Sequence, residues 1–432
     1  MQNNQVSIAE LSEDQKKVIY AIEDGYSVFV TGSAGTGKSH LLRYLKENYL
    51  DSGLHITAST GIAAVNVSGQ TIHSWAGIGL ANIPIENILE NILSKKFSYL
   101  RRRIRSTIML AIDEISMISS EVFDILDNVF RVVREDERAF GGIQMVLFGD
   151  FFQLPPISKN PDSDNNFCFN SRSWKTLDPK IFLLKTVFRQ RDPEFVRILN
   201  NIRFGEIDEK DIQILSSRIE AVDNDKNIKP TILSTHNRQV DVVNVKELEK
   251  IDSKAKFFQA KFTGDTKKRE FLKKNCLVNE NLELKIGAQI MMLKNTHQKH
   301  GIINGSLGIV KDFHVKTGYP IVKFNNNKII TITPEIWSSE KFDKKENKIK
   351  IEASIEQIPL ILSWAITIHK SQGMTLDKIK CNLSNVFSEG QIYVALSRVK
   401  TIGGLFITNI DFSKIKSNSK ITQFYRNIEN QQ

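Results

Sequence analysis

Apolar and amphipathic segments alternate along the first part of the chain, from residue 12 to about residue 190. Short apolar runs are typical of buried strands, and apolar residues at helical spacing indicate helices between them. We expect strands at residues 27–31, 55–58, 107–112, 143–148 and 181–184, and helices at residues 12–23, 39–50, 61–67 and 119–134. This alternation predicts an α/β fold with a parallel sheet covered by helices on both faces.

The alternation is interrupted twice. Residues 69–104 contain Trp75, several glycines and a run of three arginines, and we expect an inserted subdomain there. A second α/β pattern begins near residue 230 and resumes at residues 360–410. Between its two parts, residues 250–356 are rich in lysine and in short β-type segments separated by turn signals, which predicts a small β-barrel.

The end of the chain has two interpretations. Residues 417–432 are polar enough to form a mobile tail. Ile421, Phe424 and Tyr425 would instead allow a helix to dock on the rest of the protein.

Composition narrows the class of protein. The chain has 432 residues, of which 41% are hydrophobic and 25% charged, and a formal net charge of +10. This suits a globular protein of several domains, and the basic balance weakly favours a polyanionic partner. No apolar run is long enough to span a bilayer, the first residues show no targeting pattern, and the three cysteines are isolated. We expect a cytoplasmic protein without disulfides or structural zinc, associated with a bacterial nucleoid or a virus.

The strongest chemical signal is a glycine-rich loop between an apolar strand and a helix. It reads G-S-A-G-T-G-K-S from Gly32 to Ser39 and matches a phosphate-binding loop. Glycines let the backbone N–H groups turn toward a triphosphate, and the helix N-terminus adds a favourable dipole. Lys38 is placed to reach the β- and γ-phosphates, and Ser39 to bind Mg²⁺. The predicted nucleotide-binding residues are Gly32, Ser33, Ala34, Gly35, Thr36, Gly37, Lys38, Ser39 and His40.

Polar residues follow two further apolar strands. Asp113 and Glu114 end one strand, where the first carboxylate can hold Mg²⁺ and the second can activate a water molecule. Asp150 and Gln153 end the next strand and are candidates to lie beside the third phosphate. A turn forced by the two prolines that follow is the alternative, but it does not explain the polar pair.

With these segments in order, the chain resembles a superfamily 1 helicase, and within branch 1B the PIF-type (petite integration frequency) helicases. Residues 60–64 and 69–75 are similar to the 5′→3′ branch, and residues 120–134 resemble the family's signature element. The motifs that carry the resemblance occur in order across nearly the whole chain, at residues 32–39, 57–64, 112–117, 148–156, 188–190, 367–377 and 393–398.

The resemblance implies two RecA-like domains with the nucleotide between them. It implies domain 1A at residues 1–68 and 105–188, a wedge subdomain 1B at 69–104, domain 2A at 189–249 and 357–432, and an SH3-like domain 2B at 250–356. Compared with larger members, we expect a bare core without long extensions.

The resemblance also assigns roles to residues. It implies that Gln15 contacts adenine, that Gln153 senses the γ-phosphate, and that Arg189 and Arg398 are arginine fingers. Gln372 and Gly373 would line the nucleotide cleft from the second domain. The DNA contacts it implies are Thr60, His73, Trp75, Thr367, His369 and Lys370. Core packing remains the alternative for Trp75.

The leading hypothesis is an ATP- and Mg²⁺-dependent 5′→3′ DNA helicase. It would move on single-stranded DNA and unwind duplexes, forks, and candidate G-quadruplex or RNA–DNA hybrid substrates. We expect a monomer in solution that binds single-stranded DNA and single/double-strand junctions, and no membrane. The alternatives are a RecD-like helicase, an ATP-gated single-stranded DNA-binding protein without net unwinding, and a P-loop nucleotide kinase.

Overall fold

The computed structural model describes residues 6–156, 167–219, 221–223, 228–343, 348–384, 386 and 389–431. The chain forms two compact units. Unit 1 contains Met1–Phe188, Ser339–Glu352 and Phe424–Gln432, and unit 2 contains Arg189–Ser338 and Ala353–Gln423. None of the helices in the described part of the chain is long and apolar enough to cross a membrane.

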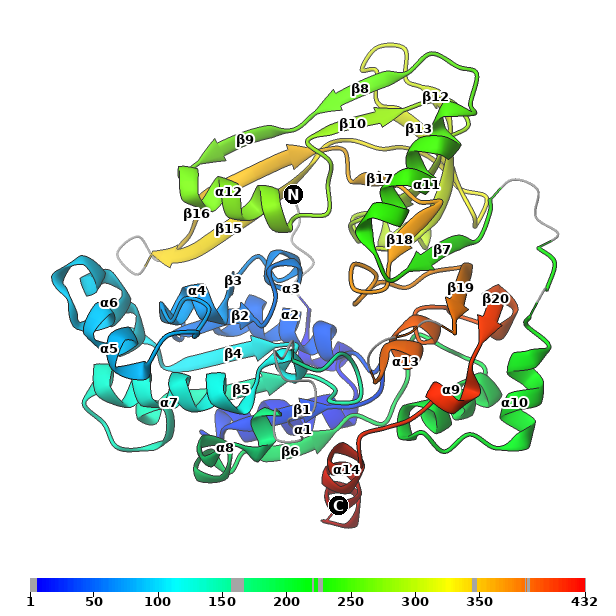
Figure 1. The fold of residues 1–432 in the computed structure, drawn as a ribbon. Coiled ribbons are helices and arrows are strands. Elements are labelled where there is room, and N and C mark those ends of the chain that lie inside the picture. The colour runs from blue at the N-terminus through cyan, green and yellow to red at the C-terminus, as the bar shows by residue number, and fades with distance from the viewer. Residues whose placement is uncertain are drawn as a thin grey trace. The chain divides into compact units, whose positions relative to one another are not determined.

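The core of unit 1 is a parallel sheet, which within the described residues has six strands in the order β3-β2-β4-β5-β1-β6 (Figure 1). Each predicted strand is present, and its ends lie within two residues of the expected ones. The strands are β1 (Val28–Thr31), β2 (Leu54–Ala58), β3 (Gln70–Thr71), β4 (Met109–Asp113), β5 (Gln144–Phe148) and β6 (Lys180–Leu183).

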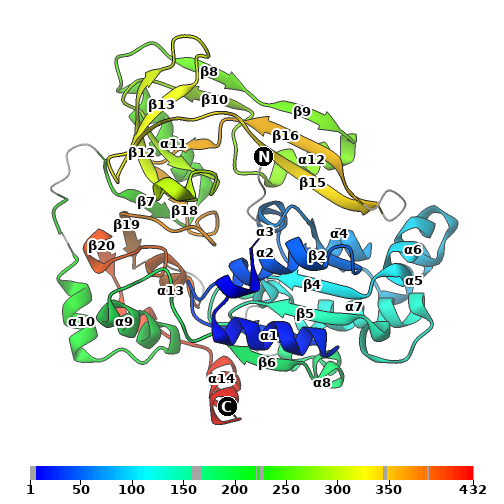
Figure 2. The same cartoon turned by 180° about the vertical axis from the view of Figure 1, so that it is seen from behind.

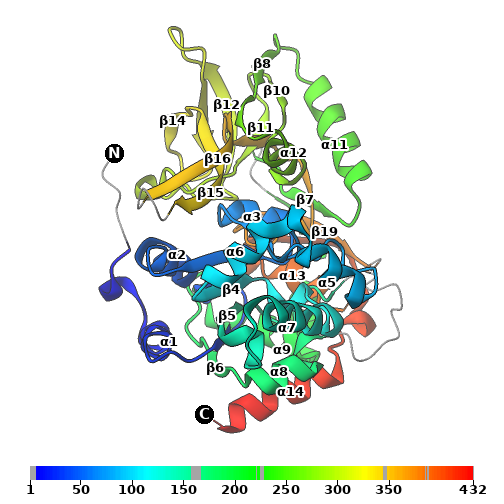
Figure 3. The ribbon, with the colours of Figure 1, turned by 90° about the vertical axis from the view of Figure 1, so that its left-hand side faces the viewer.

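Helices cover both faces of this sheet, as the alternation predicts. Helices α1 (Glu13–Glu23) and α2 (Lys38–Tyr49) cross one face, which is turned toward the viewer in Figure 2. Helix α7 (Ser120–Arg134) lies on the opposite side of the sheet in Figure 3 and packs against α8 (Arg172–Leu177). Connections between parallel strands are right-handed, so connections that run in opposite directions along the sheet place their helices on opposite faces.

Strand β1 shows how the two faces are packed. Val28 and Val30 belong to an apolar cluster with residues of α1 and α2. Phe29 faces the other way and contacts Phe151 and Trp174, with ring centroids 5.2 Å away in each case. Because side chains alternate along a strand, one short apolar run supplies both layers of the core.

The segment at residues 69–104, where we expect an inserted subdomain, is divided between the main sheet and a group of helices. Gln70 and Thr71 pair in parallel with Thr57 and Ala58, so the first residues of the expected insertion belong to the main sheet. The remaining part of that segment is mainly helical. It contains α4 (Ile72–Ala76), α5 (Ile85–Leu93) and α6 (Ser98–Ser106), and α3 (Gly61–Asn66) precedes it.

The C-terminal residues form helix α14 (Ser419–Gln431), which confirms the docked helix and excludes the mobile tail for the described residues. Ile421 and Tyr425 are buried, with exposed fractions of 4% and 0%. Residues from Phe424 onward are grouped with unit 1.

Unit 2 contains a second parallel sheet, whose described strands have the order β18-β7-β19-β20. The strands are β7 (Thr231–Ser234), β18 (Ala365–Thr367), β19 (Ile379–Leu383) and β20 (Leu405–Ile410). The accompanying helices are α9 (Pro193–Phe204), α10 (Glu209–Ser216), α11 (Asn237–Glu249) and α13 (Gln391–Leu396). The expected second α/β pattern is therefore present.

Residues between β7 and β18 form antiparallel sheets, as the spacing of turn signals predicts. The described strands of the largest one have the order β14-β13-β12-β11-β17, and its core includes Ile290, Val310 and Phe324. The elements are β8 (Lys256–Gln259), β9 (Lys261–Gly264), α12 (Thr266–Asn275), β10 (Asn281–Leu284), β11 (Gln289–Met292), β12 (Leu307–Phe313), β13 (Pro320–Phe324), β14 (Ile329–Thr331), β15 (Glu335–Asp343), β16 (Lys348–Gln357) and β17 (Leu360–Leu362).

Candidate active site

The glycine-rich loop connects the buried end of β1 to the first turn of α2. Gly32, Gly35 and Gly37 have φ angles of 150°, 88° and 86°. A Cβ atom on Gly32 would lie 2.6 Å from the Leu184 carbonyl oxygen, and one on Gly37 would lie 2.6 Å from Gln15 Nε2. The backbone conformation therefore favours glycine at all three positions, and at Gly32 a backbone carbonyl also leaves no space for a side chain.

The loop is shaped to receive an anion. Gly37 precedes α2 and has no side chain, so it leaves the first backbone N–H groups of the helix for a ligand. The Thr36 hydroxyl donates to the Ser33 carbonyl at 2.9 Å and holds the loop closed. The Lys38 ammonium donates to the carbonyls of Gly32, at 2.7 Å, and of Ser33, at 3.1 Å. A triphosphate seated on this loop would meet that ammonium.

Gln15 is part of the same site. Its side chain is buried, and its Nε2 donates to the Gly37 carbonyl at 3.2 Å. Its Oε1 accepts from the Ser12 backbone N–H at 2.9 Å and completes the cap of α1. The structure thus brings Gln15 to the loop, while its contact with adenine stays a prediction.

Asp113 is the last residue of β4, and Glu114 follows it. They lie at the carboxyl ends of the parallel strands, where β1 also leads into the loop. Glu114 has a left-handed backbone, with φ 53° and ψ 46°, which is uncommon for a residue other than glycine and is characteristic of functional sites. Burial and the neighbouring Glu114 carboxylate raise the pKa of Asp113 to about 7, although Lys38 acts in the opposite direction.

This electrostatic environment fits a divalent cation. Burial and the charge of a second acid destabilise the ionised form of a carboxyl group, and a bound cation would offset this repulsion. Among the described residues, no cluster of three or more His, Cys, Asp or Glu side chains is arranged to hold a metal by itself. Mg²⁺ commonly takes only one or two protein ligands and the phosphates of its substrate. Ser39 and Asp113 are the residues that would hold it.

Asp150 and Gln153 form a buried turn after β5. Asp150 Oδ1 accepts from the Phe152 N–H at 3.3 Å, and Asp150 Oδ2 accepts from Gln153 Nε2 at 3.5 Å. Gln153 is 6% exposed. The Asp150 carboxylate therefore orients the amide of Gln153, as a γ-phosphate sensor requires.

In unit 2, Arg189 and Arg398 meet at Ser397. Arg189 donates to the Thr375 hydroxyl at 3.0 Å and to the Ser397 carbonyl at 3.1 Å. Arg398 donates to the Ser397 hydroxyl at 2.9 Å and to the Val394 carbonyl at 2.8 Å, and its side chain is buried. The two candidate arginine fingers, far apart in sequence, therefore share one backbone segment after α13.

The other nucleotide candidates of unit 2 follow β18. Gly373 has a φ of 79°, and no atom of the described residues lies within 4 Å of where a Cβ would be, so its conformation, rather than crowding, favours glycine. The Nε2 atom of Gln372 is buried and has no hydrogen-bond partner in the part of the chain that the structure describes. A buried amide donor of this kind is available to a ligand.

Comparisons with known proteins identify the family of the chain. A family profile described as "PIF1-like helicase" matches residues 10–213, and one described as "DNA helicase Pif1, 2B domain" matches residues 269–313. The chain is 38% identical to the ATP-dependent DNA helicase PIF1 of Danio rerio over 421 residues, covering 97% of this chain and 64% of that protein.

Solved structures show the same relationship. Bacteroides sp. Pif1 in complex with ADP-AlF4 is 34% identical, with a TM-score of 0.86, and the match covers 98% of this chain and 97% of that one. Bacteroides Pif1 bound to ssDNA is also 34% identical, with a TM-score of 0.63 and coverage of 98% and 97%. The chain belongs to the PIF1-like helicase family. It spans a little under two thirds of the length of several of its curated relatives.

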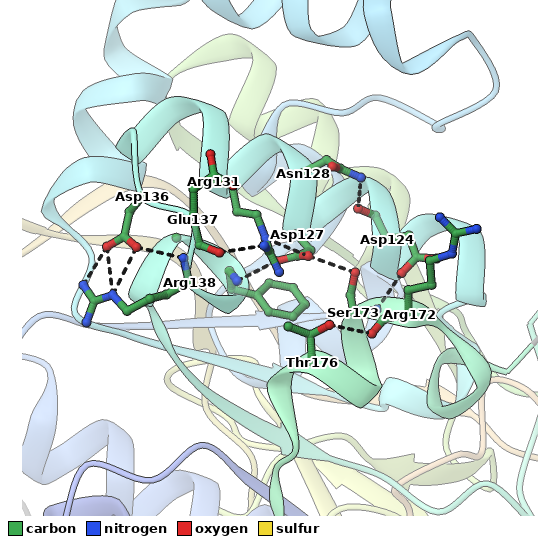
Figure 4. Close-up of polar contacts among 12 residues, drawn as sticks. Asp124, Asp127, Asn128, Arg131, Asp136, Glu137, Arg138, Arg172, Ser173 and Thr176 are labelled. Carbon is green, nitrogen blue, oxygen red and sulfur yellow. Dashed lines mark hydrogen bonds and ion pairs between the residues drawn. The ribbon is translucent and has the colours of Figure 1, made fainter.

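Residues 120–134, which we expect to be the family's signature element, form helix α7, and a polar network anchors this helix (Figure 4). Asp127 is 5% exposed, and its carboxylate accepts from Arg131 Nε, the Phe140 N–H and the Ser173 hydroxyl. Asp124 accepts from the Ser173 N–H at 2.9 Å. The network ties α7 to α8.

The residues expected to contact DNA differ in how far their side chains are exposed. Trp75 is 2% exposed, and its ring lies 5.7 Å from Phe130 and 5.6 Å from His55. The ring packs in the core of the DNA-free structure, which favours the core-packing alternative, and its contact with DNA stays a prediction. Thr367 is also buried, and its hydroxyl accepts from the Lys370 N–H at 3.2 Å, so its DNA contact stays a prediction as well.

The remaining candidates are accessible. Thr60 caps α3 by accepting from the Ala63 N–H, and it stays partly exposed. Burial lowers the pKa values of His73 and His369, so both imidazoles are neutral at pH 7 and suit hydrogen bonding or stacking better than phosphate pairing. Lys370 is partly exposed and cationic. The DNA roles of these four residues stay predictions.

Sequence reasoning missed three residues that organise the site. Gln190 donates to the carbonyls of Ser397 and Val399, and Ser397 joins the two arginines. Tyr425 reaches the ends of β1 and β5 from the C-terminal helix. Its aromatic neighbour Phe424, in an otherwise polar segment, was the available signal for a docked helix.

Proposed function

We propose that the chain is an ATP-dependent DNA helicase that translocates 5′→3′ on single-stranded DNA. The observation that carries the proposal is the division of the catalytic residues between two units. Lys38, Asp113, Glu114 and Gln153 belong to unit 1, whereas the arginines at 189 and 398 belong to unit 2. An enzyme that has to convert ATP hydrolysis into movement needs such a division, because nucleotide-dependent closure then moves one unit against the other.

The chemistry assigned to unit 1 is hydrolysis of the γ-phosphate. Lys38 and the loop N–H groups bind the phosphates, and Gln153 orients the reacting end. The Glu114 carboxylate takes a proton from the attacking water. Mg²⁺ held by Ser39 and Asp113 would supply charge neutralisation when bound.

Unit 2 supplies the remaining positive charge. A planar guanidinium can make two parallel hydrogen bonds to phosphate oxygens, which suits Arg189 and Arg398 to stabilise charge on the transferred phosphoryl group. A P-loop nucleotide kinase would leave the second parallel sheet and these arginines without a role.

The proposed partners are single-stranded DNA and single/double-strand junctions. Bacteroides Pif1 has been crystallised with ssDNA, which supports this choice. Thr60, His73, His369 and Lys370 are the proposed contacts, and the non-specific grip would combine phosphate and base-face contacts. We further propose domains 1A, 1B, 2A and 2B with the boundaries expected from the sequence, and a monomer in solution.

One assay pair tests the function. ATP hydrolysis is measured with and without single-stranded DNA, and unwinding is measured on duplexes with a 5′ tail or a 3′ tail. We expect DNA-stimulated hydrolysis and unwinding of the 5′-tailed duplex, and no activity in Lys38→Ala, which serves as the negative control. Unwinding from 3′ tails alone would refute the polarity. DNA-stimulated hydrolysis without any unwinding would favour the ATP-gated DNA-binding protein.

A further inference from the structure

The C-terminal helix places two aromatic residues in the core of unit 1. Phe424 stacks on Phe169, with ring centroids 4.4 Å apart and planes 17° apart. Tyr425 stacks on Phe152, with centroids 4.7 Å apart and planes 27° apart. Tyr425 is 0% exposed, so its hydroxyl group has to be satisfied inside the protein.

That hydroxyl lies between two strand ends that carry parts of the active site. It is 2.6 Å from the Thr31 hydroxyl, at the last residue of β1, although the two residues are 394 positions apart. It accepts from the Phe151 N–H at 3.1 Å, and it lies 3.4 Å from Asp150 Oδ1, to which it can donate. Thr31 immediately precedes Gly32, and Asp150 holds Gln153.

We propose that Tyr425 is a positioning residue for ATP hydrolysis, whose hydroxyl fixes the start of the phosphate loop relative to the turn that carries Gln153. The proposal rests on the function proposed above. Tyr425 touches no nucleotide itself. It acts through Thr31 on one side, and through Asp150 and its bond to Gln153 on the other.

Removing the hydroxyl leaves specific groups without a partner. The Phe151 N–H and the Thr31 hydroxyl belong to residues that are 0% exposed, so solvent does not replace the lost bonds in the folded state. The cheapest adjustment is a local shift of the turn at residues 150–153, because the aromatic stack of the ring remains. Such a shift would misplace Gln153 and lower the turnover rate while leaving the phosphate-binding loop able to bind ATP.

The test compares the full-length chain with Tyr425→Phe, which removes only the hydroxyl. Tyr49→Phe is the matched control, because the Tyr49 hydroxyl makes a bond of the same length, 2.6 Å, to Glu23 at the surface. In DNA-stimulated hydrolysis we expect kcat to fall about threefold to tenfold in Tyr425→Phe, with a smaller change in the KM for ATP. Tyr49→Phe should keep the parent kcat.

A double-mutant cycle separates positioning from a merely structural role. In a Gln153→Ala background, Tyr425→Phe should cause no further loss of kcat, since the residue through which it acts is gone. Thr31→Val, which removes the partner hydroxyl with little change in volume, should reproduce the effect. A parent kcat in Tyr425→Phe, or a full additional loss in the Gln153→Ala background, would overturn the proposal.

A binding measurement keeps this inference distinct from the proposed function. Affinities for fluorescent ATPγS and ADP analogues are measured without DNA, and Tyr425→Phe should lower the ratio of ATPγS to ADP affinity at least about twofold. If the parent chain shows no DNA-stimulated hydrolysis, the helicase proposal fails, and an unchanged affinity ratio would then reject the role of Tyr425 as well. A changed ratio would retain that role.

Discussion

Glu114 adopts a left-handed backbone directly after Asp113 and donates its backbone N–H to Asp113 Oδ1 at 2.9 Å. Two carboxylates that follow each other would normally point to opposite sides of an extended strand. The left-handed turn at Glu114 ends the strand and frees its side chain from the alternation. The observed strain therefore accompanies a specific placement of the candidate base, which is typical of functional sites.

We expect Glu114→Gln to lower DNA-stimulated ATP turnover by at least about a hundredfold, because the amide cannot accept the proton from water. ATP affinity should remain, since the phosphate loop is unchanged. Glu135→Gln is a matched control, because Glu135 has a similar left-handed φ of 56° but pairs with Arg105 at the surface. Parent turnover in Glu114→Gln would remove Glu114 from the role of base.

The raised pKa of Asp113 makes stability depend on pH. Its pKa of about 7 in the folded protein exceeds the ordinary value of 3.8, so between these values the folded chain holds a proton that the unfolded chain has released. The free energy of unfolding therefore falls as the pH rises through this range. Asp113→Asn removes this contribution, so its stability relative to the parent protein should rise between about pH 4 and about pH 7.

Urea denaturation in metal- and nucleotide-free buffer measures this difference. Comparing each variant with the parent at the same pH cancels the titration of the histidines. Asp136→Asn is the control, because Arg138 lowers the pKa of Asp136 to about 2, and this group is ionised in both states across the whole range. Stability differences for Asp113→Asn that stay constant with pH would contradict the assignment.

Sequence reasoning succeeded where chemistry is encoded in short, continuous segments. The loop at residues 32–39 and the acids at 113 and 114 lie within or directly after single elements, so a strand followed by polar residues was sufficient to find them. The edge strand at Gln70–Thr71 was missed because two residues provide too little periodicity. Tyr425 was not assigned to the site because it contacts Thr31 only in the folded chain, across a separation of 394 positions.

Arg189 is one of the two candidate arginine fingers of unit 2. We expect Arg189→Ala to lower kcat about a thousandfold, within the range usual for such arginines. Arg189→Lys should not restore it, because one ammonium cannot reproduce the fork that bonds Thr375 and Ser397. Arg197→Ala is the control, since Arg197 belongs to the same unit and pairs with the exposed Asp208 and the buried Asp211. Equal losses in the two alanine variants would indicate a general structural effect.

Substitutions of Trp75 test whether its ring serves to pack the core or to stack on DNA bases. Its ring packs edge-on against Phe130 and below the Arg103 guanidinium, 5.1 Å from the ring centroid. We expect Trp75→Ala to lower the free energy of unfolding by about 3–5 kcal/mol, as for large aromatic side chains removed from cores.

Trp75→Phe separates the two roles, because it keeps an apolar ring in the core. Its affinity for single-stranded DNA, measured by fluorescence anisotropy, should stay within about twofold of the parent value, since losing a base stack would cost about 1–3 kcal/mol and therefore at least fivefold in affinity. His73→Ala provides the comparison, because His73 lies two residues earlier and is partly exposed. A tenfold loss of DNA affinity in Trp75→Phe with unchanged unfolding would mean that the ring leaves the core to bind DNA. The packing against Phe130 would then describe only the DNA-free protein.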